Sequence, residues 1–309
     1  MSTTEYQLVI IGGGPGGLTA GLYAARDRLD AVLLERGALG GQVLTTDWID
    51  NYPGFPDGIS GFDLIDKMTA QAARFGLKTL NGNVTGLQLS DTKKKILLEN
   101  GDEIACQAII ISTGARPNKL NIPGEKELTG KGVSYCATCD APFYRDQEIA
   151  VVGGGDTAVQ EAAHLTKFAS KVTIIHRRDT LRATRILQEK AFANDRIKFI
   201  WDTEVVGIKG ATEVESLQLR NRNGEESSLD VSGVFILIGT RPNNEILPLE
   251  QLGADSDGFV ITDDEMRTRV PGVMAVGDIR SKTVRQVVNA AGEGAVAAVS
   301  AEHYLNQLT

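Results

Sequence analysis

Cysteine and long apolar runs are scarce in this chain, and positive charge is not in excess. Only three cysteines occur among 309 residues, Cys106, Cys136 and Cys139, too few for the framework of structural disulfides that small secreted proteins use. No stretch approaches the roughly 18 consecutive apolar residues of a membrane span. Lys and Arg number 32 against 40 Asp and Glu, which gives a net charge of −8. The whole chain therefore offers no basic surface for nucleic acid or an anionic membrane.

The first residues of the chain also lack the features of a secretion signal. Residues 1–7 contain no Lys or Arg, and the apolar run over 8–11 ends at once in glycines. A signal peptide has a basic start and a longer apolar segment. We therefore expect a cytoplasmic protein whose partner is a small molecule or another protein, with no nucleic acid and no membrane.

Glycine, in contrast, is abundant, with 34 residues, and many of them lie in two similar units. In the first, an expected strand over 6–11 leads into Gly12-Gly13-Gly14-Pro15-Gly16-Gly17, then a helical pattern over 18–26 and a strand over 31–34. This Gly-x-Gly-x-x-Gly fingerprint is typical of βαβ dinucleotide-binding units, in which glycines permit the tight turn, the approach of a pyrophosphate and the packing of helix on strand. Glu35 lies 35 − 12 = 23 positions after the first glycine, where an acid can accept hydrogen bonds from ribose hydroxyls.

The same pattern recurs later in the chain. A strand expected over 149–152 leads into Gly153-Gly154-Gly155-Asp156-Thr157-Ala158, followed by a helical pattern over 159–167 and a strand over 171–175. Cations replace the acid: His176 stands at its position, followed by Arg177 and Arg178, with Arg182 further on. A carboxylate would repel a 2′-phosphate, whereas arginines bind one through charge-assisted hydrogen bonds. The second site is therefore predicted to prefer NADP to NAD; the alternative is a tight turn beside a solvated basic surface.

Two further segments resemble each other and suggest how the domains are connected. A strand over 109–112 breaks into Thr113-Gly114-Ala115-Arg116-Pro117-Asn118, and a strand over 234–238 breaks into Gly239-Thr240-Arg241-Pro242-Asn243. A proline-containing turn after a strand suits a crossing between domains. We expect an α/β protein with two Rossmann-like domains, the second inserted in the first: residues 1–117 with 244–309, and residues 118–243, joined by a two-stranded hinge.

The cysteine pair lies just before the second glycine fingerprint, in Cys136-Ala137-Thr138-Cys139-Asp140. A zinc site would need four ligands, and we expect no metal. The three histidines do not have the spacing of metal ligands; they are His164, His176 and His303. A redox disulfide needs two close thiols, one with a lowered pKa, and a proton carrier, for which Asp140 is available. A pair of buried structural cysteines is the alternative, and Cys106, in a strand-like segment over 103–110, is expected to fill the core.

In combination these features resemble the low-molecular-weight thioredoxin reductases of bacteria. The resemblance rests on the cysteine motif, on His176-Arg177-Arg178-Asp179 with Arg182, and on Gly277-Asp278 followed by Arg285-Gln286-Val287. It runs nearly end to end, and the cysteine pair inside the NADPH domain is specific to that family. It implies a homodimer with FAD in the first domain and NADPH in the second. It also implies that NADPH reduces FAD, FAD reduces the Cys136/Cys139 disulfide, and this pair reduces thioredoxin or a thioredoxin-like protein.

The resemblance also implies roles for individual residues. Asp278 would reach the ribitol chain, and the helix beginning near Arg285 would point its positive end at the flavin ring. Cys139 would be the flavin-facing sulfur, Cys136 would attack the partner, and Asp140 would protonate the leaving thiolate. The inserted domain would rotate, because nicotinamide and disulfide cannot share one flavin face. The implied FAD contacts are Gly12, Gly13, Gly14, Pro15, Gly16, Gly17, Glu35, Gly40, Gly41, Gln42, Asn51, Val84, Thr113, Gly114, Gly277, Asp278, Arg285, Gln286 and Val287. The candidate NADPH residues are Gly153, Gly155, Asp156, Thr157, Ala158, His176, Arg177, Arg178, Arg182 and Gly239.

One departure from the family and three alternatives stay open at this point. Relatives often have Gly and an aromatic directly after the Asp, where this chain has Ala141-Pro142 before Phe143-Tyr144. That segment contributes to thioredoxin docking in relatives, so the partner is less well specified than the cofactors. The first alternative is a flavin reductase that uses ferredoxin or another donor, which the arginine cluster disfavours. The second is a peroxide-system reductase, for whose additional domain we expect no room before residue 6. The third is a nucleotide-binding redox sensor without turnover.

Overall fold

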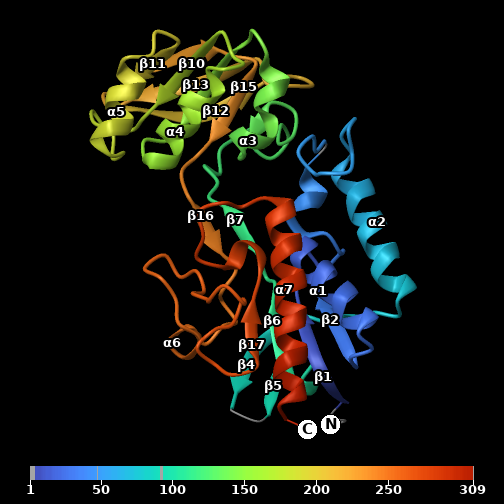
Figure 1. Ribbon diagram of the computed structural model, residues 1–309. Coiled ribbons are helices and arrows are strands. Elements are labelled where there is room, and N and C mark those ends of the chain that lie inside the picture. The colour runs from blue at the N-terminus through green and yellow to red at the C-terminus, as the bar shows by residue number, and fades with distance from the viewer. Residues whose placement is uncertain (1–3, 47, 91–92, 309) are drawn as a thin grey trace. The chain divides into compact units, whose positions relative to one another are not determined.

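The structure, a computed structural model, describes residues 4–46, 48–90 and 93–308. The chain divides into two compact units: unit 1 comprises Met1–Arg116 and Arg241–Thr309, and unit 2 comprises Pro117–Thr240. These divisions fall one residue and three residues before the boundaries expected from the sequence. At the two crossings, β7 (Ala115–Pro117) and β16 (Thr240–Pro242) pair as a two-stranded sheet (Figure 1). Among the described residues, no helix is long and apolar enough to cross a membrane.

Unit 1 is built on a mostly parallel sheet with the order β3-β2-β1-β6-β5-β4, in which β17 also pairs with β6. The pairs β1/β2, β2/β3, β1/β6 and β6/β17 are parallel, and β4/β5 and β5/β6 are antiparallel. Its strands are β1 (Thr4–Ile11), β2 (Ala31–Glu35), β3 (Lys78–Asn81), β4 (Val84–Leu89), β5 (Lys94–Leu98), β6 (Glu103–Ile111) and β17 (Val273–Ala275).

Successive strand residues point to opposite faces of this sheet, and so they pack into different clusters. In β1, Leu8 and Ile10 pack into a cluster with the helices, while Val9 and Ile11 pack into a second cluster on the other face. The long helix α7 lies beside α1 (Figure 1). The approach is so close that a Cβ on Gly294 would lie 2.3 Å from the Gly16 carbonyl oxygen. The helical elements are α1 (Pro15–Arg26), η1 (Gly41–Thr45), α2 (Gly61–Arg74), α6 (Leu249–Leu252), η3 (Gly277–Ile279) and α7 (Val287–Asn306).

Unit 2 has three layers: helices, a parallel sheet and a smaller antiparallel sheet. The parallel sheet has the order β11-β10-β9-β15-β8 and the antiparallel sheet the order β12-β13-β14. Ile149 and Val151 of β9 pack against the helices, and Ala150 and Val152 pack toward the antiparallel strands. The strands are β8 (Val133–Ser134), β9 (Glu148–Val152), β10 (Lys171–Ile175), β11 (Ile197–Ile200), β12 (Thr203–Lys209), β13 (Ser216–Asn221), β14 (Glu226–Asp230) and β15 (Gly233–Ile236). The helical elements are α3 (Ala137–Asp140), η2 (Ala141–Tyr144), α4 (Asp156–Leu165) and α5 (Arg185–Phe192).

Two helices begin earlier than expected from the sequence. α1 begins at Pro15 and α4 at Asp156, three residues before the apolar patterns at 18 and 159, whereas α7 begins at Val287, close to the start expected near Arg285. Glycines cap the first two, Gly14 and Gly155, and proline is well suited to a first helical position because its φ angle is already fixed there. The apolar pattern reports only the buried face, so it missed the first turn of each helix. Both helices therefore start directly at the glycine turns.

Candidate active site

The glycines of the first fingerprint differ in what they permit. Gly12 has φ of +103°, and a Cβ there would lie 2.3 Å from the Ser112 carbonyl oxygen, so this turn requires glycine. A Cβ on Gly17 would lie 1.9 Å from the Gly12 carbonyl oxygen. At Gly14, in contrast, no described atom lies within 4 Å of the Cβ position. Packing inside the described chain does not explain the missing side chain of Gly14, which leaves open space at the start of α1.

The start of α1 also leaves its backbone donors available. Gly14 caps the helix with no side-chain hydrogen bond among the described residues, and the first turn contains no acid. The first N–H groups of a helix lack intrahelical acceptors and form its positive end. Glu35 steadies this loop, since its carboxylate accepts hydrogen bonds from Gly13 N at 2.8 Å and Gly37 N at 3.0 Å. An anion can therefore bind here.

The segment after β2 lies against the same glycines. Gly40 N donates to the Gly13 carbonyl oxygen at 2.8 Å. A Cβ on Gly41 would lie 3.6 Å from Gly14 Cα, which places Gly41 and the adjoining Gln42 next to the first fingerprint. Val84, the first residue of β4, is buried in the core cluster that also holds Leu34.

Four more predicted residues, Thr113, Gly114, Asn51 and Gln286, make hydrogen bonds to distant parts of the chain. Thr113 follows β6, and its Oγ1 is buried with no hydrogen-bond partner in the described part of the chain. Asn243 Nδ2 donates to the Thr113 carbonyl oxygen at 2.7 Å, and Asn243 N donates to Gly114 O at 3.0 Å. Asn51 Nδ2 donates to Gln286 Oε1 at 3.0 Å, which joins the loop before α2 to the start of α7.

Charged groups gather around Gly277 and Asp278 at η3. Burial raises the pKa of the Asp278 carboxyl, while Lys282 and Arg285 act in the opposite direction. Lys282 Nζ lies 3.6 Å from Asp278 Oδ1. The Arg285 guanidinium lies over the Phe259 ring at 4.2 Å, and its Nε is buried with no partner among the described residues. α7 then begins at Val287 with no side-chain cap in the described chain and no acid in its first turn.

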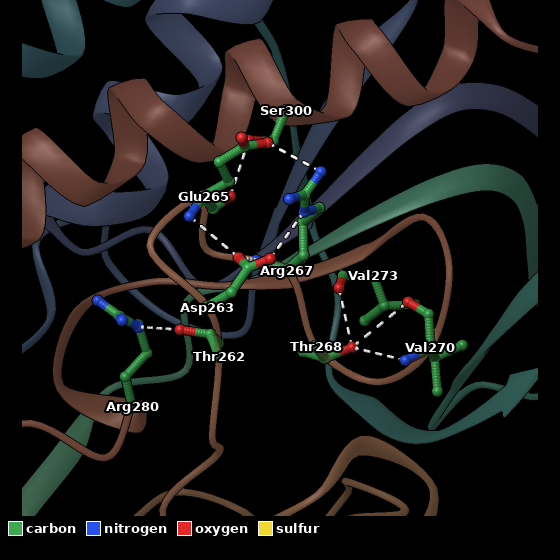
Figure 2. Close-up of polar contacts among 9 residues, drawn as sticks. All are labelled: Thr262, Asp263, Glu265, Arg267, Thr268, Val270, Val273, Arg280 and Ser300. Carbon is green, nitrogen blue, oxygen red and sulfur yellow. Dashed lines mark hydrogen bonds and ion pairs between the residues drawn. The ribbon is translucent and has the colours of Figure 1, made fainter.

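Glu293 organises this region and was missed by the sequence analysis. Its carboxylate accepts from Gly277 N at 2.7 Å and forms ion pairs with Arg280 at 2.7 Å and Lys282 at 3.2 Å. Figure 2 shows that Arg280 Nε also donates to Thr262 Oγ1, at 2.7 Å. The available signal was an acid at position 293 between two glycines of an otherwise small and apolar helix.

The second fingerprint repeats the arrangement in unit 2. Gly153 has φ of +152°, and its Cβ would lie 2.5 Å from Leu237 O and 2.7 Å from Ala158 Cβ. At Gly155 the nearest atom to the Cβ position is a terminal guanidinium nitrogen of Arg182, 4.0 Å away. Arg182 N donates to Gly154 O at 2.7 Å, so this segment folds back on the turn. Asp156, followed by Thr157, opens α4 and accepts from Thr184 N at 2.6 Å.

His176 lies across this turn. A Cβ on Gly154 would lie 2.3 Å from a ring carbon of His176, so the ring covers the glycine, and its buried Nε2 has no hydrogen-bond partner in the described residues. Burial lowers the pKa of His176, a backbone hydrogen bond involving Thr180 opposes this, and the nearby arginines lower it further. The exposed Arg177 and Arg178 follow directly. Gly239, in contrast, lies at the chain crossing, where its carbonyl oxygen accepts from Asn118 N at 2.9 Å.

Cys136 and Cys139 form a disulfide at the short helix α3. Cys136 caps this helix, its Sγ accepting from Cys139 N at 3.3 Å. Asp140 ends the helix, and its carboxylate accepts from the hydroxyl of Ser134, a residue that sequence reasoning did not find. The pair is partly exposed and Phe143 beside it is 49% exposed.

The third cysteine is unlike this pair. Cys106 lies in β6, is 2% exposed and packs in the core, as predicted. Burial raises the pKa of its thiol to about 12, although Lys94 partly opposes this. Because the thiolate is the reactive form of cysteine, Cys106 is inert near neutral pH. Cys106 is therefore no candidate for thiol–disulfide exchange.

Comparisons with known proteins agree with these features. The family model described as pyridine nucleotide-disulphide oxidoreductase matches residues 6–294. A thioredoxin reductase of Peptoclostridium litorale is 47% identical over 98% of both chains, and one of Listeria innocua is 45% identical over 98% of this chain and 95% of the relative. The solved thioredoxin reductase of Streptococcus pyogenes MGAS5005 matches with a TM-score of 0.94 and 45% identity, covering 99% of this chain and 100% of that one. The chain therefore belongs to the pyridine nucleotide-disulphide oxidoreductases, within the group of the thioredoxin reductases.

Proposed function

We propose that unit 1 binds FAD, that unit 2 binds NADPH, and that the Cys136–Cys139 disulfide passes electrons to thioredoxin or a thioredoxin-like protein. The proposal rests on one observation above all: the disulfide and the acid Asp140 share α3, in the same unit as a glycine turn surrounded by arginines. A dinucleotide site alone would fit many dehydrogenases. A redox disulfide in the NADPH unit fits a disulfide reductase.

The residues of unit 1 fit a bound FAD. The open space at Gly14 and the uncapped start of α1 suit a pyrophosphate. Glu35 keeps lone pairs for ribose hydroxyls although it also accepts from Gly13 N. Thr113 Oγ1 and Arg285 Nε are buried donors without partners among the described residues, and a flavin offers acceptors for both. Asp278 would hold a hydroxyl of the ribitol chain.

The residues of unit 2 fit NADPH in the same way. The pyrophosphate would lie at Gly155 and the start of α4, and the buried Nε2 of His176 lacks a partner in the described chain that a phosphate oxygen could supply. Arg177, Arg178 and Arg182 surround the place of the 2′-phosphate. NADH lacks this phosphate, so these arginines would select NADPH.

The chemistry assigned to this chain's own residues is thiol–disulfide exchange. When bound, FAD would accept a hydride equivalent from NADPH and supply two electrons to the protein disulfide. Two electrons break the Cys136–Cys139 bond, and Asp140 donates a proton to the sulfur that leaves, Cys136. Cys136 then returns this proton to the Asp140 carboxylate and attacks the partner's disulfide as a thiolate, which forms a mixed disulfide and releases one partner thiolate to take a proton from water. Attack by Cys139 on Cys136 releases the second partner thiol and restores the disulfide.

We also propose a cytoplasmic homodimer. α7 exposes apolar side chains on one stripe, Val288, Val296 and Val299. Positions separated by eight and three residues lie on one face of a helix, and a second copy of the chain would cover this face. The buried free thiol of Cys106 fits a reducing compartment.

Separating the two half-reactions tests the proposed function. Cys136→Ser and Cys139→Ser should each abolish reduction of thioredoxin, while NADPH still bleaches the flavin, because hydride transfer needs no thiol. Cys106→Ser is the matched control and should keep both half-reactions. If either variant of the pair binds FAD and NADPH but no longer shows flavin bleaching, the proposed order of electron transfer is wrong.

A further inference from the structure

Ser134 is a buried hydroxyl directly before the redox disulfide. It ends β8, where its backbone pairs in register with Phe235 of β15, and the residue is 4% exposed. A buried hydroxyl needs hydrogen-bond partners to offset the loss of water. The partners of Ser134 are groups of the two residues that the proposed function assigns to chemistry, Cys136 and Asp140.

These contacts close a ring around Cys136. The Ser134 hydroxyl accepts a hydrogen bond from Cys136 N at 3.1 Å and lies 2.5 Å from Asp140 Oδ2. Asp140 N in turn donates to the Cys136 carbonyl oxygen at 3.2 Å. The Cys136 carbonyl oxygen is also 3.3 Å from Ser134 Oγ, but a hydroxyl has one proton, and Asp140 Oδ2 is the closer acceptor. Both peptide groups of Cys136 are thus connected to the acid.

We propose that Ser134 is a positioning residue for disulfide reduction: its hydroxyl holds the Asp140 carboxylate and ties it to the main chain of Cys136. In this role Ser134 acts through Asp140. The inference rests on the proposed function, in which Asp140 is the proton donor. Its strand position explains the choice of residue, because a side chain fixed on β8 gives the short α3 helix a rigid support.

The Ser134 hydroxyl acts at one step of the reaction, the protonation of the leaving thiolate. In the proposed function, two electrons from NADPH break the S–S bond through FAD, and the leaving thiolate takes the proton of Asp140. The acid becomes a carboxylate at that moment, and the Ser134 O–H donates a charge-assisted hydrogen bond to it. Removing the donor therefore makes the carboxylate form less favourable, and the acid keeps its proton to higher pH.

The elements packed against α3 carry other titratable groups. α3 packs against α4, which carries Asp156, Glu161 and His164, and against η2, which carries Tyr144. Burial raises the pKa of Tyr144 to about 12, with the charges of Asp140 and Glu213 adding to the effect. None of these side chains is altered in the variants below, so a shift of the pH profile follows from the Ser134–Asp140 contact.

The test is the pH profile of thioredoxin reduction by the holoenzyme at saturating NADPH. Ser134→Ala should move the falling alkaline limb upward by about one to two pH units, since a hydrogen bond to a charged group is worth that much. It should also lower the plateau about tenfold or more through loss of orientation. Flavin reduction by NADPH, followed separately, should be unchanged. Ser134→Thr keeps the hydroxyl and should keep the native alkaline limb. Ser134→Val has the same shape as Ser134→Thr but no hydroxyl, and it should shift the limb. This second pair decides the question if Ser134→Ala does not fold.

Controls separate the inference from the proposed function. Ser300→Ala is the matched control: Ser300 is 6% exposed, and its hydroxyl donates to the Glu265 carbonyl oxygen at 2.7 Å in unit 1 (Figure 2). It should keep the native profile. Asp140→Asn should lack the alkaline limb, and adding Ser134→Ala to this variant should lower thioredoxin turnover little further. Native turnover in Asp140→Asn would overturn the role of Asp140 and this inference with it. If Asp140→Asn slows thioredoxin reduction but the alkaline limb of the pH profile does not shift in Ser134→Ala or in Ser134→Val, the inference alone is overturned.

Discussion

At the scale of single residues, the arginines around the second glycine turn decide which nucleotide binds. Arg177 and Arg178 are exposed at the end of β10, and Arg182 is brought to the turn by its backbone bond to Gly154. Losing one charged hydrogen bond costs on the order of 1.5 to 3 kcal/mol. Arg177→Ala should therefore raise the Michaelis constant for NADPH at least about tenfold, with little effect on NADH.

Steady-state kinetics with both nucleotides measure this effect. Arg220 is an exposed arginine of β13 in the same unit and pairs with Glu226 of β14. Arg220→Ala is therefore the control for a lost surface charge and should leave both constants unchanged. Equal use of NADPH and NADH by the native protein would contradict the role given to the arginine cluster.

What the sequence predicts at this scale depends on how far apart the interacting residues are. Glu35, His176 and the arginines follow from a fixed offset after each glycine turn, because one βαβ unit determines their position. Glu293 could not be found in this way, since it meets Gly277 only through the packing of α7. The contact between Ser134 and Asp140 likewise depends on the side-chain geometry of β8 and α3, which no spacing rule describes.

At the scale of elements, the glycine turn before α1 offers a clean separation of folding from binding. A Cβ on Gly14 meets no described atom, and its φ of −72° is accessible to alanine. Gly14→Ala should therefore fold with an unchanged melting temperature as the apoprotein, yet bind FAD at least about tenfold more weakly, because a methyl group would occupy the phosphate position.

Titration of the apoprotein with FAD tests this prediction, and two other glycines serve as references. Gly292→Ala, on the open face of α7 with no described atom near its Cβ position, should bind FAD normally. Gly12→Ala should lower the stability of the apoprotein itself, since its Cβ would lie 2.3 Å from a carbonyl oxygen at φ of +103°. Normal FAD affinity in Gly14→Ala would place the cofactor elsewhere.

The ion-pair cluster on α7 should stabilise unit 1. The side chains of Glu293, Arg280 and Lys282 are only 11 to 12% exposed, so removing the carboxylate leaves two cations without their shared partner. Glu293→Ala should lower the free energy of unfolding by about 3 kcal/mol, measured by urea denaturation. Glu302→Ala, near the end of the same helix, should change it little. Equal effects of the two substitutions would contradict the structural role of Glu293.

Element boundaries show a second limit of the sequence. The central strands β1, β2, β6, β9, β10 and β15 follow from short apolar runs, most of them beside the glycine turns. The remaining strands and the order within the sheets do not follow from these patterns. The first turns of α1 and α4 do not follow from them either, because their glycines and polar residues carry no apolar period. These unpredicted turns are the ones that would bind phosphate.

At the scale of the whole molecule, the exposed stripe on α7 predicts how two copies meet. Val296 is 39% exposed between Val288 and Val299. Val296→Asp should shift the protein from dimer to monomer in light scattering, because burying an unpaired carboxylate at an apolar interface is unfavourable. Ile186→Asp, an equally severe change at an exposed residue of α5 in unit 2, should leave the dimer intact. A monomeric native protein, or a dimeric Val296→Asp variant, would contradict the interface.

The central claim, that Cys136 exchanges with thioredoxin, is tested most directly by covalent capture. Cys139→Ser leaves Cys136 without its resolving partner. It is mixed with a thioredoxin variant that lacks its own resolving thiol and whose remaining cysteine carries thionitrobenzoate as a mixed disulfide. Attack by the Cys136 thiolate should release thionitrobenzoate and give a disulfide between the two proteins. Mass spectrometry should locate the bond at Cys136, and dithiothreitol should release it. Cys136→Ser should give no such complex. A covalent complex through Cys139 would reverse the two sulfurs, and no complex in either variant would contradict the account.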